Sequence, residues 1–174
     1  MIEKNSKGLV HVYTGDGKGK TTAALGLAMR AAGQDMKVAF IQFLKGLPCG
    51  EHLFVNKHNP FEIVQTSVGD IFKKSKEQAS HEAQQTLDYA EHEIISGKYD
   101  LVVLDEIFIA LNQGLITIKQ VLDLLDSKPA SVELVLTGRK APPEIIQRAD
   151  LVTEMLMIKH PFNEGTDARR GIEY

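Results

Sequence analysis

The chain has 174 residues, of which 43% are hydrophobic, and this is enough for one well-packed domain. Its formal net charge of −3 argues against a general nucleic-acid binder, because such proteins are usually basic. The sequence has no apolar stretch of membrane-spanning length, and its single cysteine excludes an internal disulfide. We therefore expect a single domain over residues 1–174, located in a reducing cytoplasm, with no membrane or nucleic-acid partner.

Residues 8–33, GLVHVYTGDGKGKTTAALGLAMRAAG, combine an apolar strand at 9–13, a glycine-rich loop and an alanine-rich helix. A phosphate-binding P-loop requires this order, because the backbone N–H groups of the loop and the N-terminus of the helix attract an anion. The strict pattern G-x-x-x-x-G-K-[ST] begins with glycine, whereas this chain has Thr14 there. A glycine-rich turn without a ligand is the alternative. We favour it less, because Lys18 and Lys20 would repel each other without an anion.

This loop supplies most of the predicted nucleotide-binding residues. Its glycines let the backbone approach phosphate oxygens closely. Lys20 is expected to reach the phosphates, and the Thr21 hydroxyl to bind a magnesium ion that arrives with the nucleotide. The predicted nucleotide-binding residues of this segment are Gly15, Asp16, Gly17, Lys18, Gly19, Lys20, Thr21 and Thr22, with Arg30 as a further candidate on the helix.

Apolar runs and helical patterns alternate along the rest of the chain. We predict helices at 20–33, 77–96, 107–112, 118–127 and 142–149, and further strands at 36–43, 61–65, 101–104, 132–139 and 150–160. Residues 44–60 are predicted to form a loop, and 161–174 an irregular tail. This alternation predicts an α/β layered fold with a mostly parallel sheet, in which ligands bind outside the carboxyl ends of the strands.

Two more stretches carry polar residues at such strand ends. Asp105 and Glu106 follow an apolar strand, as in a Walker-B motif, where an acidic group orients the metal beside the P-loop threonine. The spacing does not decide which carboxylate contacts the metal, and a solvated acidic pair is the alternative. Arg139 ends the strand at 132–139 and is placed to neutralise phosphate charge with its planar guanidinium.

These residues alone indicate a magnesium-dependent nucleotide-binding enzyme and leave three reactions open. A hydrolase would use Glu106 to activate water, and a kinase would pass the γ-phosphoryl group to an acceptor. A third class would use the triphosphate as a leaving group. The histidines show no metal-ligand spacing, and we interpret Cys49 as an inert thiol.

Several stretches, in order, resemble one family. They are VYTGDGKGKTTAALGLAMRAAG, VAFIQFLKG, GE at 50–51, YDLVVLDE, TGRKAP, ADLVTEM, and IKHPFNEG with GIEY at the end. Together they resemble the P-loop type of ATP:corrinoid adenosyltransferase, also called cob(I)yrinic acid a,c-diamide adenosyltransferase. The resemblance extends from Gly8 to Tyr174 and implies a RecA-like P-loop fold. It also accounts for Thr14, because the family's loop has the compact form G-x-G-K-G-K-T-T.

The resemblance implies the third reaction class. A Co(I) corrinoid attacks the 5′-carbon of ATP, and triphosphate leaves. Matched by motif, Lys20, Glu106 and Arg139 are implied as catalytic residues, and Thr21, Asp105 and Glu106 as the metal site. Arg30 matches an arginine of the P-loop helix. The resemblance further implies Mg2+ with ATP as co-substrate, and cobalamin, cobinamide or cobyrinic acid a,c-diamide as acceptor. A reductant such as flavodoxin or reduced flavin and a homodimer are also implied.

One element departs from the family pattern. Members often carry a Gly-Phe-x-Trp element whose aromatic side chains help free the lower face of the cobalt. The corresponding stretch here is SVGDIFKK, and the chain has no tryptophan, so Phe72 is the candidate corrinoid contact. A P-loop ATPase or kinase that uses the same loop is kept as an alternative. The missing aromatic element supports a second alternative, a nucleotide-dependent corrinoid carrier.

Overall fold

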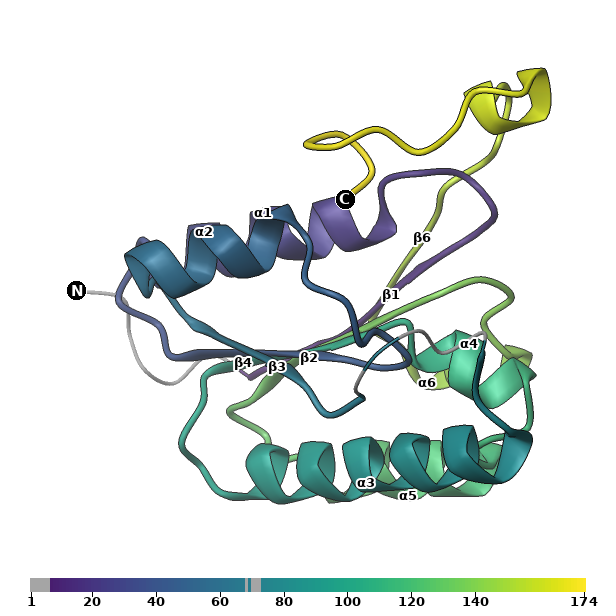
Figure 1. Cartoon of the computed structure of the whole chain (residues 1–174). Coiled ribbons are helices and arrows are strands. Elements are labelled where there is room, and N and C mark those ends of the chain that lie inside the picture. Colours follow the sequence, from purple (N-terminus) through teal and green to yellow (C-terminus); the bar gives the residue numbers. More distant parts are fainter. Residues whose placement is uncertain (1–6, 68, 70–72) are drawn as a thin grey trace.

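A computed structural model describes residues 7–67, 69 and 73–174. The described residues form one six-stranded sheet, in which every neighbouring pair of strands is parallel (Figure 1). The strand order is β3-β2-β4-β5-β1-β6. The strands are β1 Val10–Thr14, β2 Val38–Gln42, β3 Glu62–Gln65, β4 Leu101–Asp105, β5 Glu133–Thr137 and β6 Leu151–Glu154. This is the predicted α/β fold.

Helices cover both faces of the sheet, as parallel strands require, because each connection must cross back over a face. In Figure 1, α1 and α2 lie on one face, and α3 and α5 on the other. The helices are α1 Lys20–Ala32, α2 Gly50–His58, α3 Lys76–Ile95, α4 Ile107–Asn112, α5 Ile118–Ser127 and α6 Pro143–Arg148, with a 3-10 helix η2 at Pro161–Glu164. Within these described ranges, no helix is long and apolar enough to cross a lipid bilayer.

The core consists of two layers, one on each side of the central strands. Along β4, Leu101 and Val103 pack with the α1 layer, whereas Val102 and Leu104 pack with the layer that contains α3 and α5. Every residue of β4 is buried, and residues 101–104 accordingly appear in the sequence as an unbroken apolar run that ends at Asp105. Each fully buried aliphatic side chain contributes about 1.5–3 kcal/mol to folding. The two layers therefore fix the strand ends that carry the polar residues.

The prediction of a loop at residues 44–60 is wrong, because this segment contains α2. The helix lacks the usual sequence signals. Its N-cap residue is Cys49 rather than Ser, Thr, Asp or Asn, and Leu53 and Phe54 are exposed while Val55 is buried. The cap is supplied instead by His52, whose Nδ1 accepts a hydrogen bond of 2.8 Å from the Cys49 N–H. A histidine in this capping role is not a recognisable start signal.

The predicted strand at residues 150–160 is too long, since β6 ends at Glu154. Strand β6 is an edge strand that pairs only with β1 among the described strands, and β1 itself ends at Thr14. Beyond that point the Met155 carbonyl accepts a hydrogen bond from the Gly17 N–H of the loop instead. The strand therefore stops where its partner turns into the P-loop.

Candidate active site

The glycine-rich loop joins β1 to α1 and packs closely against the segment that follows β6. Gly17 N–H donates a 2.7 Å hydrogen bond to the Met155 carbonyl oxygen. A Cβ atom on Gly15 would lie 2.4 Å from that same oxygen, and Gly15 has a φ of +96°. These glycines are thus needed for packing within the chain, besides leaving room for phosphate oxygens.

Thr14, the exception to the strict P-loop pattern, has a structural role at the start of the loop. Its side chain is buried, and its Oγ1 accepts a 3.1 Å hydrogen bond from the Ala141 N–H. The segment after β5 is therefore held against the loop. Arg139, in the same segment, lies with its Nη1 3.8 Å from Asp16 Oδ1, and both side chains are about half exposed. The structure brings Arg139 to the loop, as its position at a strand end predicts.

The two loop lysines have different surroundings. Lys20 is buried, and its Nζ donates a 2.7 Å hydrogen bond to the Gly17 carbonyl oxygen. Burial lowers the pKa of Lys20, while the negative charge of Glu106 opposes this effect. Lys18 is exposed and contacts the C-terminal tail, with its Nζ 2.7 Å from Glu173 Oε1 and 3.1 Å from the Ile172 carbonyl oxygen. Lys20 therefore belongs to the loop interior, and Lys18 to the contact between the loop and the tail.

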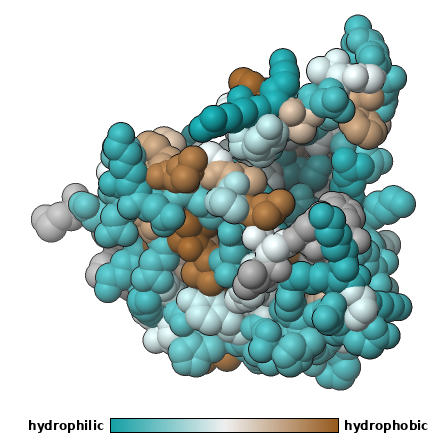
Figure 2. All heavy atoms as spheres, viewed as in Figure 1, coloured by the Kyte–Doolittle hydropathy of each residue, from teal (hydrophilic) through white to brown (hydrophobic). Residues whose placement is uncertain are grey.

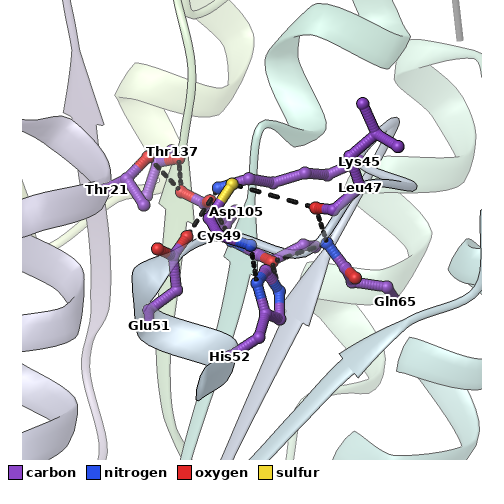
Figure 3. A network of polar contacts seen from close by, with 10 residues as sticks. Thr21, Lys45, Leu47, Cys49, Glu51, His52, Gln65, Asp105 and Thr137 are labelled. Atoms are coloured by element: carbon purple, nitrogen blue, oxygen red, sulfur yellow. Dashed lines mark hydrogen bonds and ion pairs between the residues drawn. The ribbon is translucent and has the colours of Figure 1, made fainter. Parts of the chain in front are cut away.

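Asp105, at the end of β4, accepts hydrogen bonds on both carboxylate oxygens (Figure 3). Its Oδ1 accepts from the hydroxyls of Thr21, at 2.9 Å, and Thr137, at 2.7 Å. Its Oδ2 accepts from Gln42 Nε2 at 3.2 Å. Burial raises the pKa of Asp105, and the hydrogen bonds from Thr137, Thr21 and Gln42 oppose the rise. The Walker-B prediction of an acidic group beside the P-loop threonine matches this contact.

Glu106 is the N-cap residue of α4 and has a left-handed backbone conformation, with φ of 62°. Such conformations are rare for residues other than glycine and are concentrated at functional sites. Its N–H donates a 3.0 Å hydrogen bond to Thr137 Oγ1, which fixes the backbone. Its Oε2 is buried, and no described residue hydrogen-bonds to it. Burial raises the pKa of Glu106, the charge of Asp105 raises it further, and Lys20 lowers it.

The unpartnered oxygen of Glu106 indicates whether the residues of this site suit a magnesium ion. A buried carboxylate oxygen without a donor is costly unless a cation or donor arrives to pair with it. The hydroxyl of Thr21 and the carboxylates of Asp105 and Glu106 are oxygen donors, which Mg2+ prefers. The residues therefore fit this ion.

Four residues around Asp105 were absent from the predicted site: Gln42, Lys45, Glu51 and His52. Lys45 Nζ lies 2.6 Å from Glu51 Oε1. Burial alone would lower the pKa of Lys45, but the hydrogen bond and charge of Glu51 outweigh it and the net shift is upward. Gln42 is paired in register with Asp105 across β2 and β4. The available signal for Gln42 was a polar residue inside the otherwise apolar run at 38–43. His52 gave none.

Cys49, Glu51 and His52 bring potential metal-ligand atoms within 4.8 Å of one another. Both ring nitrogens of His52 are already in hydrogen bonds, to the Cys49 N–H and to Gln42 Oε1. Glu51 is paired with Lys45. These ligand atoms are in use, so the cluster does not define a metal centre.

Two other predicted residues, Arg30 and Thr22, stand apart from the residues around Asp105. Arg30 is exposed in the last turn of α1, ten positions after Lys20, which corresponds to a rise of about 15 Å along the helix. Within this chain the structure does not bring Arg30 to the loop. Thr22 is exposed in the first turn of α1. Phe72 lies outside the described residues.

A cavity of about 660 Å³ lies between the loop, Arg139 and the C-terminal tail. Its walls combine apolar side chains with basic ones, including Met157, Phe162, Lys18, Arg139 and Arg169. Pockets of about 300–1,000 Å³ with a few convergent polar groups are typical of ligand sites. This cavity adjoins the loop through Gly17 and Lys18.

A parallel α/β sheet with a glycine-rich loop before α1, and an aspartate at the end of β4 bonded to the loop threonine, defines a P-loop nucleotide-binding protein. A family model described as "ATP:corrinoid adenosyltransferase BtuR/CobO/CobP" matches residues 6–174. The chain belongs to this family.

Individual relatives agree with the family match. A corrinoid adenosyltransferase of Pseudomonas aeruginosa is 35% identical over 98% of this chain and 86% of its own length. One from Sinorhizobium is 37% identical over 98% of this chain and 82% of its own length. The corrinoid adenosyltransferase CobA of Salmonella typhimurium is 32% identical over 98% of this chain and 88% of its own length. The resemblance inferred from the motifs is confirmed, and the chain is an enzyme of this class.

Proposed function

We propose that the chain transfers the 5′-deoxyadenosyl group of ATP to the cobalt of a reduced Co(I) corrinoid at the P-loop site, with Mg2+ bound alongside the nucleotide. Transfer of the adenosyl group of ATP to corrinoid cobalt is the activity of the family to which the chain belongs. The observation that carries the placement of the site is the Thr21–Asp105 hydrogen bond next to the unpartnered Glu106 oxygen.

The proposed step balances as a nucleophilic substitution. An electron pair of Co(I) forms the bond to the 5′-carbon, the bond from that carbon to the triphosphate oxygen breaks, and triphosphate leaves with the pair. The cobalt becomes formally Co(III). Because Co(I) is a strong nucleophile, the protein needs no general base. Its contribution is to align the two reactants and to stabilise the departing polyanion.

The residue roles follow from the positions of the charges. Lys20 and the loop N–H groups other than that of Gly17 hold the phosphates, and Arg139, beside Asp16, neutralises further negative charge. Thr21, Asp105 and Glu106 would hold the ion, which would neutralise charge on the triphosphate when bound. The cavity between the loop and the tail is the proposed space for the rest of the reactants, since Lys18 and Arg139 line it.

We also propose a homodimer in the cytoplasm, supplied with Co(I) by a reductant such as flavodoxin or reduced flavin. The single cysteine is compatible with a reducing compartment. Support for the dimer comes from exposed apolar surface. All four residues of the edge strand β6 are exposed, and Figure 2 shows apolar side chains over α2, where Leu53 and Phe54 are exposed. Sedimentation at micromolar concentration would test the dimer.

The experiment for the proposed reaction is identification of the phosphate product by phosphorus NMR in an anaerobic mixture of protein, Mg-ATP and chemically reduced cobalamin. Release of inorganic triphosphate supports the transfer. ADP as the product would place the chain among P-loop hydrolases or kinases. ATP bound without turnover would favour a corrinoid carrier.

A further inference from the structure

The hydrogen bonds of His52 specify one tautomer of its ring. Nδ1 accepts a hydrogen bond from the Cys49 N–H at 2.8 Å, so Nδ1 carries no proton. Nε2 lies 2.6 Å from Gln42 Oε1, an atom that can only accept, so Nε2 carries the proton and donates it. The side chain is buried, and burial lowers the pKa of His52, which favours this neutral form.

This tautomer in turn sets the orientation of the Gln42 amide. With Oε1 facing the His52 N–H, the amide Nε2 points to Asp105 Oδ2 at 3.2 Å. A flipped amide would place its own N–H groups against the His52 N–H and its oxygen against the carboxylate of Asp105. Both contacts would be repulsive. Gln65 Nε2, at 3.4 Å from the same Gln42 oxygen, supports the observed orientation.

The other oxygen of Asp105 completes the connection to the P-loop. Its Oδ1 accepts from Thr21, so the direction of the Asp105 carboxylate determines where the Thr21 hydroxyl points. Because Thr21 donates its proton to Asp105, the hydroxyl lone pairs remain available for a cation. The hydrogen bonds thus run without interruption from α2, through β2 and β4, to the first turn of α1 (Figure 3).

We propose that His52 is a positioning residue for the magnesium site: its Nε2–H fixes the Gln42 amide, which orients Asp105 and thereby Thr21. His52 itself contacts neither Asp105 nor Thr21 in the contacts described above. Groups that orient metal ligands at one remove typically affect metal affinity or activity by about 10–100-fold when lost. This inference rests on the proposed Mg-ATP site.

The competing explanation is that His52 merely caps α2 through the Cys49 N–H. Two substitutions separate these roles. His52→Gln retains a donor nitrogen at the reach of Nε2, and so retains the contact to Gln42. His52→Asn retains an acceptor oxygen at the place of Nδ1, and so retains the cap, but it is too short to reach Gln42. Each variant is compared with wild type for thermal unfolding, for ATP affinity with and without Mg2+, and for adenosylation of reduced cobalamin.

The proposal predicts that His52→Asn weakens Mg2+-dependent ATP binding and lowers turnover by about 10–100-fold. It also predicts that His52→Gln stays within about threefold of wild type, since a shift of about 0.6 kcal/mol corresponds to that factor. ATP binding without Mg2+ should be the same in all three proteins. His52→Asn activity within about threefold of wild type would overturn the proposal in favour of a capping role, because this variant keeps the cap and loses the contact to Gln42. Impairment of His52→Gln would not by itself indicate a capping role, since glutamine at this helix position caps α3 and α5 through Gln78 and Gln120. Equal activity of all three would also overturn it.

The tautomer of His52 can be measured directly, and this measurement does not depend on catalysis. Nitrogen NMR of the His52 ring should show a protonated Nε2 and an unprotonated Nδ1 at neutral pH. The opposite tautomer would overturn the proposal even if both variants were impaired. If wild type formed no adenosylated corrinoid, the proposed function would fail. The tautomer and the Mg2+ dependence of ATP binding would still decide the role of His52.

Discussion

Glu106 is the residue at which stability and activity oppose each other. Burial, and then the charge of Asp105, raises the pKa of its carboxyl in the folded chain. Because the folded pKa lies above the unfolded one, the folded state binds the proton more tightly. The contribution of Glu106 to the free energy of unfolding is most favourable below the pKa that it has in the unfolded chain. This contribution is lost as the pH rises through the pKa that it has in the folded chain. A shift in this direction makes Glu106 increasingly destabilising to the ligand-free protein as the pH rises toward neutrality.

Replacing this carboxylate tests that statement. Glu106→Gln should raise the Tm of the ligand-free protein at pH 7, by about 2–4 °C if about 1 kcal/mol is relieved. The gain should shrink as the pH is lowered, while Mg2+-dependent turnover is lost because the anionic oxygen is gone. Calorimetry at pH 7 and pH 5 measures the first effect. A lower Tm for Glu106→Gln than for wild type at pH 7 would show that the Glu106 carboxylate does not destabilise the ligand-free protein.

Lys20 carries the second prediction at this scale. Lys20→Ala should reduce turnover by about 100-fold or more, since removing one preorganised donor to developing charge typically costs that much. Thr21→Ala should act in the same direction through the metal site. Lys119→Ala is the matched control, because Lys119 is largely exposed and paired only with Asp123 in the contacts described. Near-normal turnover of Lys20→Ala would contradict the P-loop assignment.

At the scale of elements, the P-loop and the segment after β6 form one packed unit. A Cβ on Gly17 would lie 2.7 Å from the carbonyl oxygens of Met155 and Leu156, whereas one on Gly26 in α1 meets nothing within 4 Å. Gly17→Ala should therefore lower both Tm and ATP affinity. Gly26→Ala should stabilise the chain by about 0.5–1 kcal/mol, because alanine suits a helix interior better than glycine. Thermal unfolding of the two variants, with ATP titration, checks both. A Gly17→Ala protein as stable as wild type would show that this packing is unimportant.

Elements differ in how well the sequence predicts them. Helix α5 begins where the sequence indicates, because Thr117 accepts a 3.3 Å hydrogen bond from the Gln120 N–H as an ordinary cap. The sequence does not predict helix α2, because its cap is a histidine side chain and its apolar pattern does not mark a buried face. Strand β6 ends earlier than the sequence predicts, because its end depends on where β1 turns, and β1 is distant from β6 in the sequence.

At the scale of the whole molecule, the order of strands brings the site together. Strands β1, β4 and β5 are adjacent in the sheet, so Thr21, Asp105 and Thr137 meet although they lie far apart in the sequence. Parallel α/β folds gather ligands at the carboxyl ends of strands, and for this reason the sequence could predict Asp105 beside the loop. It could not predict the Gln42–His52 connection, which depends on a helix without a sequence signal.

We propose that residues 1–174 fold as one domain. Both core layers share the central strands, so neither can unfold without exposing the other. Thermal unfolding should show one transition, and Mg-ATP at 100 times its Kd should stabilise the protein by about 2.7 kcal/mol. Two separated transitions in calorimetry would contradict the single domain.

The most direct test of the central claim is the stoichiometry of the products, measured anaerobically with Mg-ATP and Co(I) cobalamin. The account predicts adenosylcobalamin and inorganic triphosphate in a one-to-one ratio for wild type. Both products should fall together in Lys20→Ala, while Lys119→Ala retains both. Triphosphate without a cobalt–carbon product, or adenosylcobalamin formed equally well by Lys20→Ala, would contradict the claim that this P-loop supports the transfer.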